Sequence, residues 1–211
     1  MVLWFLLLFQ YVHNRSLWND EASLSLNILD RTFSGLLRPL DYYQVAPVLF
    51  LLIEKLFITL FGNSELQLRI FPLLCAIVSL PVFYKLTLKL TGNPMISLCA
   101  MILLGCAPQF IYYSSEVKQY EADLLVMLVL YYIAFADSVF INRWRGLILS
   151  ITGAIAIFLS NISVIALCTL GILYACRVWH SKKIKAEYWI PGMIWIIFFG
   201  INYFLFIRNH P

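Results

Sequence analysis

The chain has 211 residues, of which 62% are apolar and only 12% are charged, and its mean hydropathy is +0.85. This composition excludes an ordinary soluble domain, in which about a quarter of the residues are charged. The apolar residues fall into blocks long enough to cross a hydrocarbon core, which takes about 20 helical residues. The net charge of +4 does not indicate nucleic-acid binding, because Lys and Arg in a membrane chain mostly record its orientation. We therefore predict an all-α polytopic membrane protein.

Eight apolar blocks follow one another along the chain. They are residues 1 to 12, 45 to 62, 69 to 90, 95 to 113, 121 to 141, 146 to 161, 162 to 178 and 188 to 207. The block 45 to 62 differs from the others, because it carries Glu54 and Lys55 in its middle and is bounded by Pro47 and Gly62. At about 1.5 Å per residue it is too short for a core of about 30 Å. We expect it to lie flat in the interface with its polar edge toward water, which leaves seven crossings.

The basic residues support this topology. If 45 to 62 lies flat, the loops rich in Lys and Arg fall on one side, which the positive-inside rule makes cytoplasmic. Their basic residues are Lys85, Lys89, Arg143, Arg145, Arg177, Lys182, Lys183 and Lys185. The first loop, 13 to 68, and the turn 114 to 118 are then both extracytoplasmic. If the block crosses instead, Asp20 and Glu116 lie on opposite sides of the membrane and cannot share a site.

The first loop opens with WNDEAS, which places the adjacent carboxylates Asp20 and Glu21 just beyond a membrane segment. Apolar residues then recur at three- and four-residue spacing, which predicts a short surface helix capped by Asn19. With 45 to 62, the loop therefore holds two interfacial helices. Acidic residues stabilise a helix N-terminus by about 1 kcal/mol or less. From this feature alone, capping and a functional role are equally good explanations.

A second polar cluster, YYSSEVKQYEAD at 112 to 123, lies at the start of a later crossing. Ionisable residues at such depth usually face a cavity or a partner. Lys118 offers a fixed cation for a phosphate, Glu116 a carboxylate for proton transfer, and Tyr113 and Tyr120 offer rings that can line a sugar. A plain ion pair between Glu116 and Lys118 within the loop is the structural alternative.

Other site chemistries have little support in the sequence. All five cysteines lie inside apolar blocks and show no disulfide or metal-ligand spacing. The histidines are interpreted as interfacial residues. We predict no resident metal or cofactor, while a role for a divalent cation stays open. The first block lacks the basic flank and the cleavage site of a signal peptide, so it is expected to be a retained anchor.

The order of these features resembles the GT-C integral membrane glycosyltransferases. The nearest branch holds the protein O-mannosyltransferases, the aminoarabinose transferase of lipid A and the bacterial glycosyltransferases of lipopolysaccharide cores. The resemblance rests on one crossing followed by the acidic pair Asp20 and Glu21, QVAPVLFLL from Gln44, GNSELQLRIFPLL from Gly62 with Arg69 and Pro72, and YYSSEVKQYEAD. It covers nearly the whole chain. It implies a single module over 1 to 211 with seven crossings and juxtamembrane helices in the first extracytoplasmic loop, 13 to 68.

Two departures from this family pattern stand out. Ala46 stands before Pro47 where many members have a second proline. Many relatives also continue for several more crossings, whereas this chain ends at IRNHP. A fragment truncated at one or both ends therefore remains an open interpretation.

The resemblance implies inverting transfer of a sugar from a polyprenyl-phosphate donor to a lipid, glycan or protein acceptor at the extracytoplasmic face, in a bacterial cytoplasmic membrane. Asp20 would be the general base that takes the acceptor proton. Lys118 would balance the leaving phosphate, where many members have arginine. Glu21 would hold a neighbouring group or a metal, and Glu116 would orient Lys118 or the acceptor. The further substrate contacts expected are Gln44, Tyr113 and Tyr120.

Two other classes of function stay open. A transporter would line a path with intramembrane charges in corresponding positions of two halves. The sequence has no visible internal repeat, and its ionisable residues gather at one face, which argues against a transporter. A non-catalytic scaffold or inactive fragment is the third class. The sequence specifies neither the sugar nor the acceptor.

Overall fold

The computed structural model describes residues 1–136, 139–181 and 186–208, and within these ranges every regular element is helical. The elements are α1 (Val2–Val12), α2 (Asn19–Asp30), η1 (Gly35–Leu37), α3 (Val48–Phe61), α4 (Glu65–Leu68), α5 (Ile70–Thr91), α6 (Pro94–Gly105), α7 (Pro108–Tyr113), α8 (Tyr120–Phe135), α9 (Val139–Leu159), α10 (Ser163–Ser181), α11 (Ala186–Asn202) and η2 (Tyr203–Ile207). The predicted all-α class is confirmed. The predicted basic residues Lys182, Lys183 and Lys185 lie outside the described residues, as does the side chain of Arg177.

Three helical stretches of the described chain are long and apolar enough to cross a membrane, namely Ile70–Thr91, Ser163–His180 and Trp189–Ile207. Val2–Val12 and Pro94–Gly105 are also apolar, but they are shorter. These stretches agree with the predicted membrane character of the chain. The number of seven crossings stays a prediction.

The predicted block 95 to 113 forms two helices rather than one. α6 ends at Gly105, and α7 begins at Pro108. Proline lacks the N–H that would continue a helix, but it is favoured in the first turn of a new one. The new helix places Phe110 in a buried core with Leu7 of α1. This packing fixes the end of α7, from which the turn leading to α8 departs.

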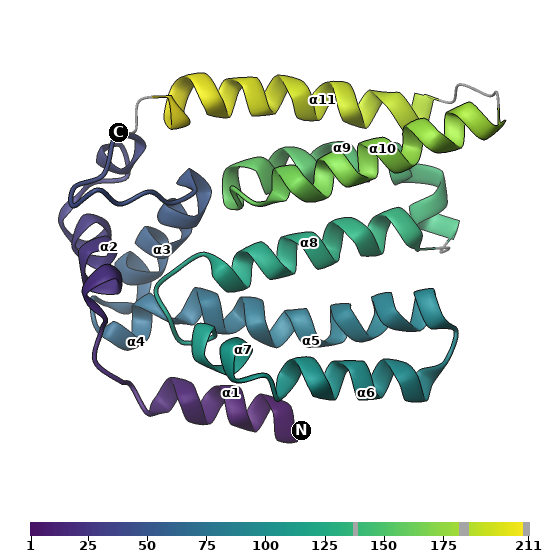
Figure 1. Ribbon diagram of the computed structural model, residues 1–211. Helices are drawn as coiled ribbons and strands as arrows, with labels where there is room; N and C mark the ends of the chain where they lie inside the picture. The colour runs from purple at the N-terminus through teal and green to yellow at the C-terminus, as the bar shows by residue number, and fades with distance from the viewer. Residues whose placement is uncertain (137–138, 182–185, 209–211) are drawn as a thin grey trace.

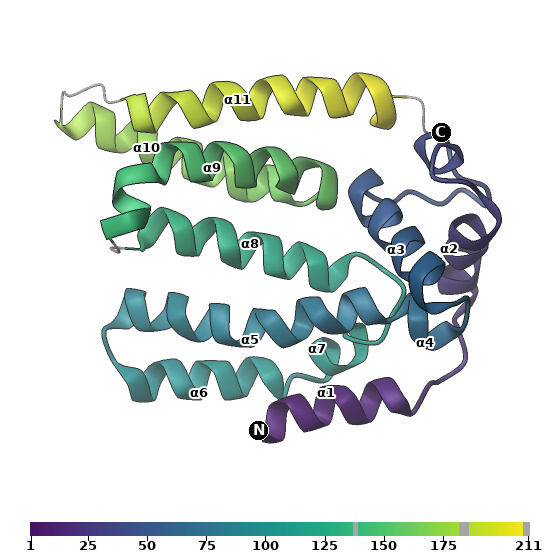
Figure 2. The ribbon, with the colours of Figure 1, turned by 180° about the vertical axis from the view of Figure 1, so that it is seen from behind.

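The long helices run side by side, and the short elements of the first loop gather at one end of them (Figures 1 and 2). α2, α3 and α4 lie at this end, where the turn between α7 and α8 also arrives. The end of α5 and the start of α9 lie at the opposite end. Lys89 is in the last turn of α5, and Arg143 and Arg145 are in the first turns of α9. This arrangement agrees with the topology that puts Asp20 and Glu116 on one side.

A shared apolar core fixes the first-loop helices. α2 contributes Leu24 and Ile28, and α3 contributes Phe50 and Ile58, all of them buried. Helical spacing of four and eight residues puts each pair on one face of its helix. Val117, from the turn before α8, belongs to the same core. The first loop and that turn are therefore packed together.

The predicted cap of α2 is wrong. The helix begins at Asn19 itself, and the preceding residue Trp18 is extended, with φ −66° and ψ 156°. The carboxylate of Glu21 accepts a hydrogen bond from the backbone N–H of Trp18 at 3.0 Å. A side chain in the first turn thus reaches back to the start of the helix, as it does in half of a capping box. Glu21 makes an Asn19 cap unnecessary.

The polar edge of α3 also differs from the prediction. Lys55 does not extend into water, because its ammonium donates to the carbonyl oxygens of Ile28 and Leu29 at 2.9 and 3.0 Å. These carbonyls belong to the last turn of α2, where cations are favoured. Lys55 therefore joins α3 to α2. The neighbouring Glu54 has no exposed surface.

Candidate active site

Three polar side chains from separate segments meet at the end of the molecule that holds the first loop. Asp20 comes from the first turn of α2, Gln44 from the loop before α3, and Lys118 from the turn before α8. Lys118 Nζ lies 2.8 Å from Asp20 Oδ2 and donates to Gln44 Oε1 at 2.9 Å. Gln44 Nε2 donates to Asp20 Oδ1 at 2.8 Å. Each side chain is bonded to the other two, and we name this set the polar triangle.

The two charged members of the polar triangle differ in exposure. The side chain of Asp20 is 64% exposed, whereas that of Lys118 is only 8% exposed. The hydrogen bond from Lys118, followed by that from Gln44, holds the pKa of Asp20 below its ordinary value. Asp20 is therefore an ionised carboxylate that other molecules can reach. Shielding of the ammonium from water strengthens its attraction for an anion nearby.

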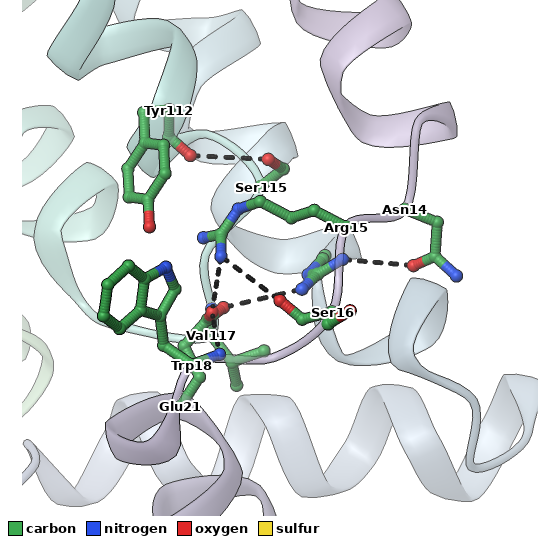
Figure 3. A network of polar contacts seen from close by, with 9 residues as sticks. Asn14, Arg15, Ser16, Trp18, Glu21, Tyr112, Ser115 and Val117 are labelled. Atoms are coloured by element: carbon green, nitrogen blue, oxygen red, sulfur yellow. Dashed lines mark hydrogen bonds and ion pairs between the residues drawn. The ribbon is translucent and has the colours of Figure 1, made fainter.

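The next residue of α2, Glu21, is completely buried and forms the centre of a second network (Figure 3). Its Oε2 accepts hydrogen bonds from Arg15 Nη1 at 2.9 Å and from the N–H of Trp18 at 3.0 Å. Its Oε1 accepts from the N–H of Val117 at 3.0 Å and lies 3.7 Å from Arg69 Nη2. One carboxylate thus ties the first loop to the start of α5 and to the turn before α8.

Two guanidinium groups balance this buried charge. Arg69 has no exposed surface and donates to Asn14 Oδ1 at 3.1 Å. Burial lowers the pKa of Arg69, and the charge of Glu21 acts in the opposite direction. Arg15 lies over the ring of Tyr112, 4.2 Å from its centroid, as in a cation–π contact. Because an unpaired buried charge is costly, each member of the network depends on the others.

Sequence reasoning missed Arg15 and the buried position of Glu21, although a signal for both was present. Glu21, Leu24 and Ile28 are spaced by three and four residues, which puts the carboxylate on the apolar face of α2. A carboxylate on such a face needs a cation within reach. Arg15 precedes the helix by a few residues, and Arg69 directly precedes α5.

Glu116 lies in the same turn as Lys118, but among the described residues no hydrogen bond or ion pair joins their side chains. Glu116 is 9% exposed, and its Oε2 has no hydrogen-bond partner among the described residues. Burial raises the pKa of Glu116, and the charge of Glu21 adds to this effect. The ammonium of Lys118 is held by Asp20 and Gln44, and a role of Glu116 in orienting Lys118 stays a prediction. A contact of Glu116 with the acceptor stays a prediction.

The predicted sugar-lining tyrosines lie on the two helices that flank this turn. The rings of Tyr113 and Tyr120 are 4.7 Å apart between centroids, with an interplanar angle of 53°. Tyr120 is 41% exposed, and Tyr113 is partly buried. The pair therefore offers aromatic surface close in sequence to Lys118. Its contact with a substrate stays a prediction.

The arrangement offers a proton acceptor beside donors for an anion. Asp20 can accept a proton, while the Lys118 ammonium and the Gln44 amide supply N–H groups. In the part of the chain that the structure describes, no group of three or more His, Cys, Asp or Glu side chains is placed to hold a metal ion.

Comparison with known proteins relates the chain to a protein family. A family model described as dolichyl-phosphate-mannose-protein mannosyltransferase matches residues 45–203, which is well over half of the chain. The matched range begins directly after Gln44 and includes Arg69, Glu116 and Lys118. No curated protein and no solved structure matches the chain.

Proposed function

The chain belongs to the dolichyl-phosphate-mannose-protein mannosyltransferase family, and from this premise we propose that it transfers a sugar from a polyprenyl-phosphate donor to an acceptor hydroxyl with inversion at the anomeric carbon. Family membership indicates a glycosyltransferase that uses such donors in general. The apolar helices are those of an integral membrane protein. The observation that supports the specific proposal is the polar triangle.

Asp20 is the general base in this proposal. As the acceptor oxygen attacks the anomeric carbon, its proton passes to the carboxylate. The bond between that carbon and the phosphate oxygen breaks, and the phosphate leaves with the electron pair. The exposure of Asp20 lets an acceptor hydroxyl come within hydrogen-bond reach, as a base requires. A single displacement of this kind inverts the anomeric configuration.

Lys118 binds the phosphate of the donor. Contacts among the described residues use two of its three N–H donors, one toward Asp20 and one toward Gln44. The remaining donor is available to an anion. When the ammonium turns toward the phosphate, Asp20 loses part of the interaction that lowers its pKa and becomes a stronger base. Donor binding therefore prepares the base for the acceptor.

Glu21 acts as a positioning residue rather than as a second base. It is buried, and its carboxylate accepts a hydrogen bond from the backbone N–H of Val117, the residue directly before Lys118. The buried carboxylate therefore fixes the backbone from which the ammonium projects. Glu116, also in this turn, is proposed to contact the acceptor.

Transfer is tested directly with the purified protein in lipid nanodiscs. A radiolabelled mannosyl-phosphoryl polyprenol is supplied with a membrane lipid extract, and movement of the label from donor to product is measured. Asp20→Asn should lower the rate by about a hundredfold to ten-thousandfold. Asp30→Asn, the same change at the exposed far end of α2, is the matched control and should transfer normally. An Asp20→Asn protein that transfers the label at the wild-type rate would show that Asp20 is not the general base. A wild-type protein that consumes no donor would favour a transporter or a scaffold.

The extracytoplasmic position of the site has its own test. Single cysteines at Asn19 and Thr91, both exposed and at opposite ends of the molecule, are introduced after the native cysteines have been replaced. An impermeant thiol reagent added to intact cells should label the cysteine at 19 and spare the one at 91. Labelling of the cysteine at 91 alone would show that the protein has the opposite orientation in the membrane.

A further inference from the structure

A tight turn of unusual composition leads into the polar triangle. The backbone N–H of Gln44 donates to the carbonyl oxygen of Asp41 at 3.3 Å. The two residues between them, Tyr42 and Tyr43, have φ values of 59° and 54°. A four-residue turn with positive φ at both central positions has the pattern of a type I′ turn.

Tyrosine is a poor residue for these positions. A Cβ atom crowds the backbone in the left-handed region, so type I′ turns favour Asn and Gly. Nothing in the turn geometry itself calls for an aromatic ring. Residues held in disfavoured backbone conformations persist where surrounding contacts enforce them, and they cluster at functional sites.

Contacts on both sides enforce this conformation. Asn27 Oδ1 accepts from the N–H of Asp41 at 2.8 Å, and Asn27 Nδ2 donates to its carbonyl oxygen at 3.2 Å. Arg31 pairs with the carboxylate of Asp41 at 2.8 Å. On the other side, the amide of Gln44 is held by Asp20 and Lys118. The turn is therefore locked between α2 and the polar triangle.

The two rings do not contribute to the core. Tyr42 is 60% exposed and Tyr43 is 89% exposed. Their positions lie one and two residues before Gln44, and neighbouring Cα atoms are about 3.8 Å apart. The turn thus presents two aromatic side chains to the outside next to the residue that holds the carboxylate.

We propose that Tyr42 and Tyr43 form a stacking platform for a pyranose ring of the acceptor, which makes the acceptor a glycan or a glycolipid rather than a protein side chain. The assignment of that ring to an acceptor rests on the proposed function. The faces of a pyranose carry C–H groups that pack on aromatic rings, while its hydroxyls point sideways. A sugar stacked beside Gln44 has a hydroxyl in reach of Asp20.

A membrane anchor explains the turn less well. Tyrosines of an aromatic belt need only the right depth in the interface, so a relaxed backbone would serve them equally. A stacking platform needs side chains that leave the backbone in fixed directions relative to Asp20, and the anchored turn fixes the backbone from which both tyrosines project. The strain and its two sets of anchors therefore favour a sugar.

The deciding variant is Tyr42→Asn with Tyr43→Gly, which gives the turn the residues that its backbone favours. Its melting temperature should rise by roughly 4–16 °C, because the strain of two residues is removed. Binding is measured by saturation-transfer NMR with octyl β-D-glucoside in nanodiscs, and 1-octanol serves as the probe without a sugar. Transfer to the sugar protons should fall at least fivefold in this variant and persist in Tyr42→Phe with Tyr43→Phe. The octanol signal should be equal in all three proteins.

Two results would overturn the proposal. Unchanged saturation transfer to the sugar protons in the Tyr42→Asn, Tyr43→Gly protein would show that the rings do not bind the pyranose. An equal loss of saturation transfer to octanol would show that the rings are a membrane anchor. If the double variant folds poorly, Tyr43→Asn alone is measured with the same probes, and an unchanged sugar signal there would equally exclude the platform. A wild-type protein that binds the glucoside but consumes no donor would refute the proposed transferase and leave the platform standing.

Discussion

Glu21→Gln probes the buried network with the smallest change of shape. The amide has nearly the size of the carboxylate, but it has no charge and places N–H groups where only acceptors fit. Arg69, which has no exposed surface, then loses its counter-charge, and so does Arg15 at 2.9 Å. The N–H of Val117 also risks losing its acceptor at 3.0 Å. The perturbation therefore leaves buried charge and a buried donor uncompensated.

The expected loss is large because Glu21 has no contact with solvent that could screen it. Removing one partner of a buried ion pair costs about 3–5 kcal/mol. For a chain of this size that corresponds to a fall in melting temperature of roughly 6–20 °C. Asp20→Asn breaks a pair whose carboxylate is 64% exposed, and such a pair contributes about 1 kcal/mol or less. Neighbouring carboxylates should thus differ severalfold in their effect on stability.

The assay is thermal unfolding followed by tryptophan fluorescence in the same detergent for all proteins. Glu21→Gln and Arg69→Gln are each measured alone and then combined. The combined variant should be more stable than the sum of the two losses predicts, because replacing Arg69 removes the buried charge that Glu21→Gln leaves without a partner at this position. Strictly additive losses, or a Glu21→Gln protein as stable as Asp20→Asn, would refute the buried network as the anchor of this site.

Three further outcomes follow from single residues. In Lys118→Gln the pKa of Asp20 should return toward its ordinary value, so the acidic limb of the rate profile, where the base is lost by protonation, should move to higher pH. Burial raises the pKa of Glu54 well above its ordinary value, so this carboxyl keeps its proton in the folded protein, whereas in the unfolded chain it releases the proton above about pH 4.3. The free energy of unfolding therefore falls as the pH rises above this value. Glu54→Gln should therefore raise the melting temperature more at pH 8 than at pH 5, and an equal gain at both would contradict the buried neutral carboxyl. A Cβ at Gly153 would overlap the indole of Trp195, which donates to the carbonyl oxygen of Leu149 at 2.9 Å. Gly153→Ala should cost about 1–3 kcal/mol in unfolding free energy. Gly171→Ala should be neutral or slightly stabilising, because its added Cβ would meet no other part of the described structure within 4 Å.

The sequence predicted the features that depend on composition and charge parity. The apolar blocks 1 to 12, 45 to 62 and 69 to 90 match α1, α3 and α5 to within a few residues, whereas block 95 to 113 forms two helices and α9 begins at Val139, seven residues before block 146 to 161. The flat placement of 45 to 62 predicted that Asp20 and the turn with Lys118 lie at the same end of the molecule. In the structure, Lys118 Nζ lies 2.8 Å from Asp20 Oδ2. Such agreement follows from counting crossings, which needs no knowledge of side-chain packing.

The features that were missed depend on which way a side chain points. Lys55 was expected in water, yet it binds the end of α2, because the carbonyls that it reaches come from another helix. The bonds that Gln44 makes join segments that the sequence separates by 24 and 74 residues. Distances of this kind arise from tertiary packing, which a single sequence does not display.

Adjacent carboxylates in WNDEAS have opposite environments because successive residues of a helix point about 100° apart. With Leu24 and Ile28 directed into the core, Glu21 must face inward, and Asp20 is left at the edge. The two residues share one stretch of backbone, so the buried side chain of Glu21 also fixes the backbone position of Asp20, the proposed base. Catalytic groups need placement to within about 0.5 Å, which an exposed side chain at a helix end would not achieve alone. In the proposed mechanism, the buried member of the pair is therefore what positions the exposed member to act as a base.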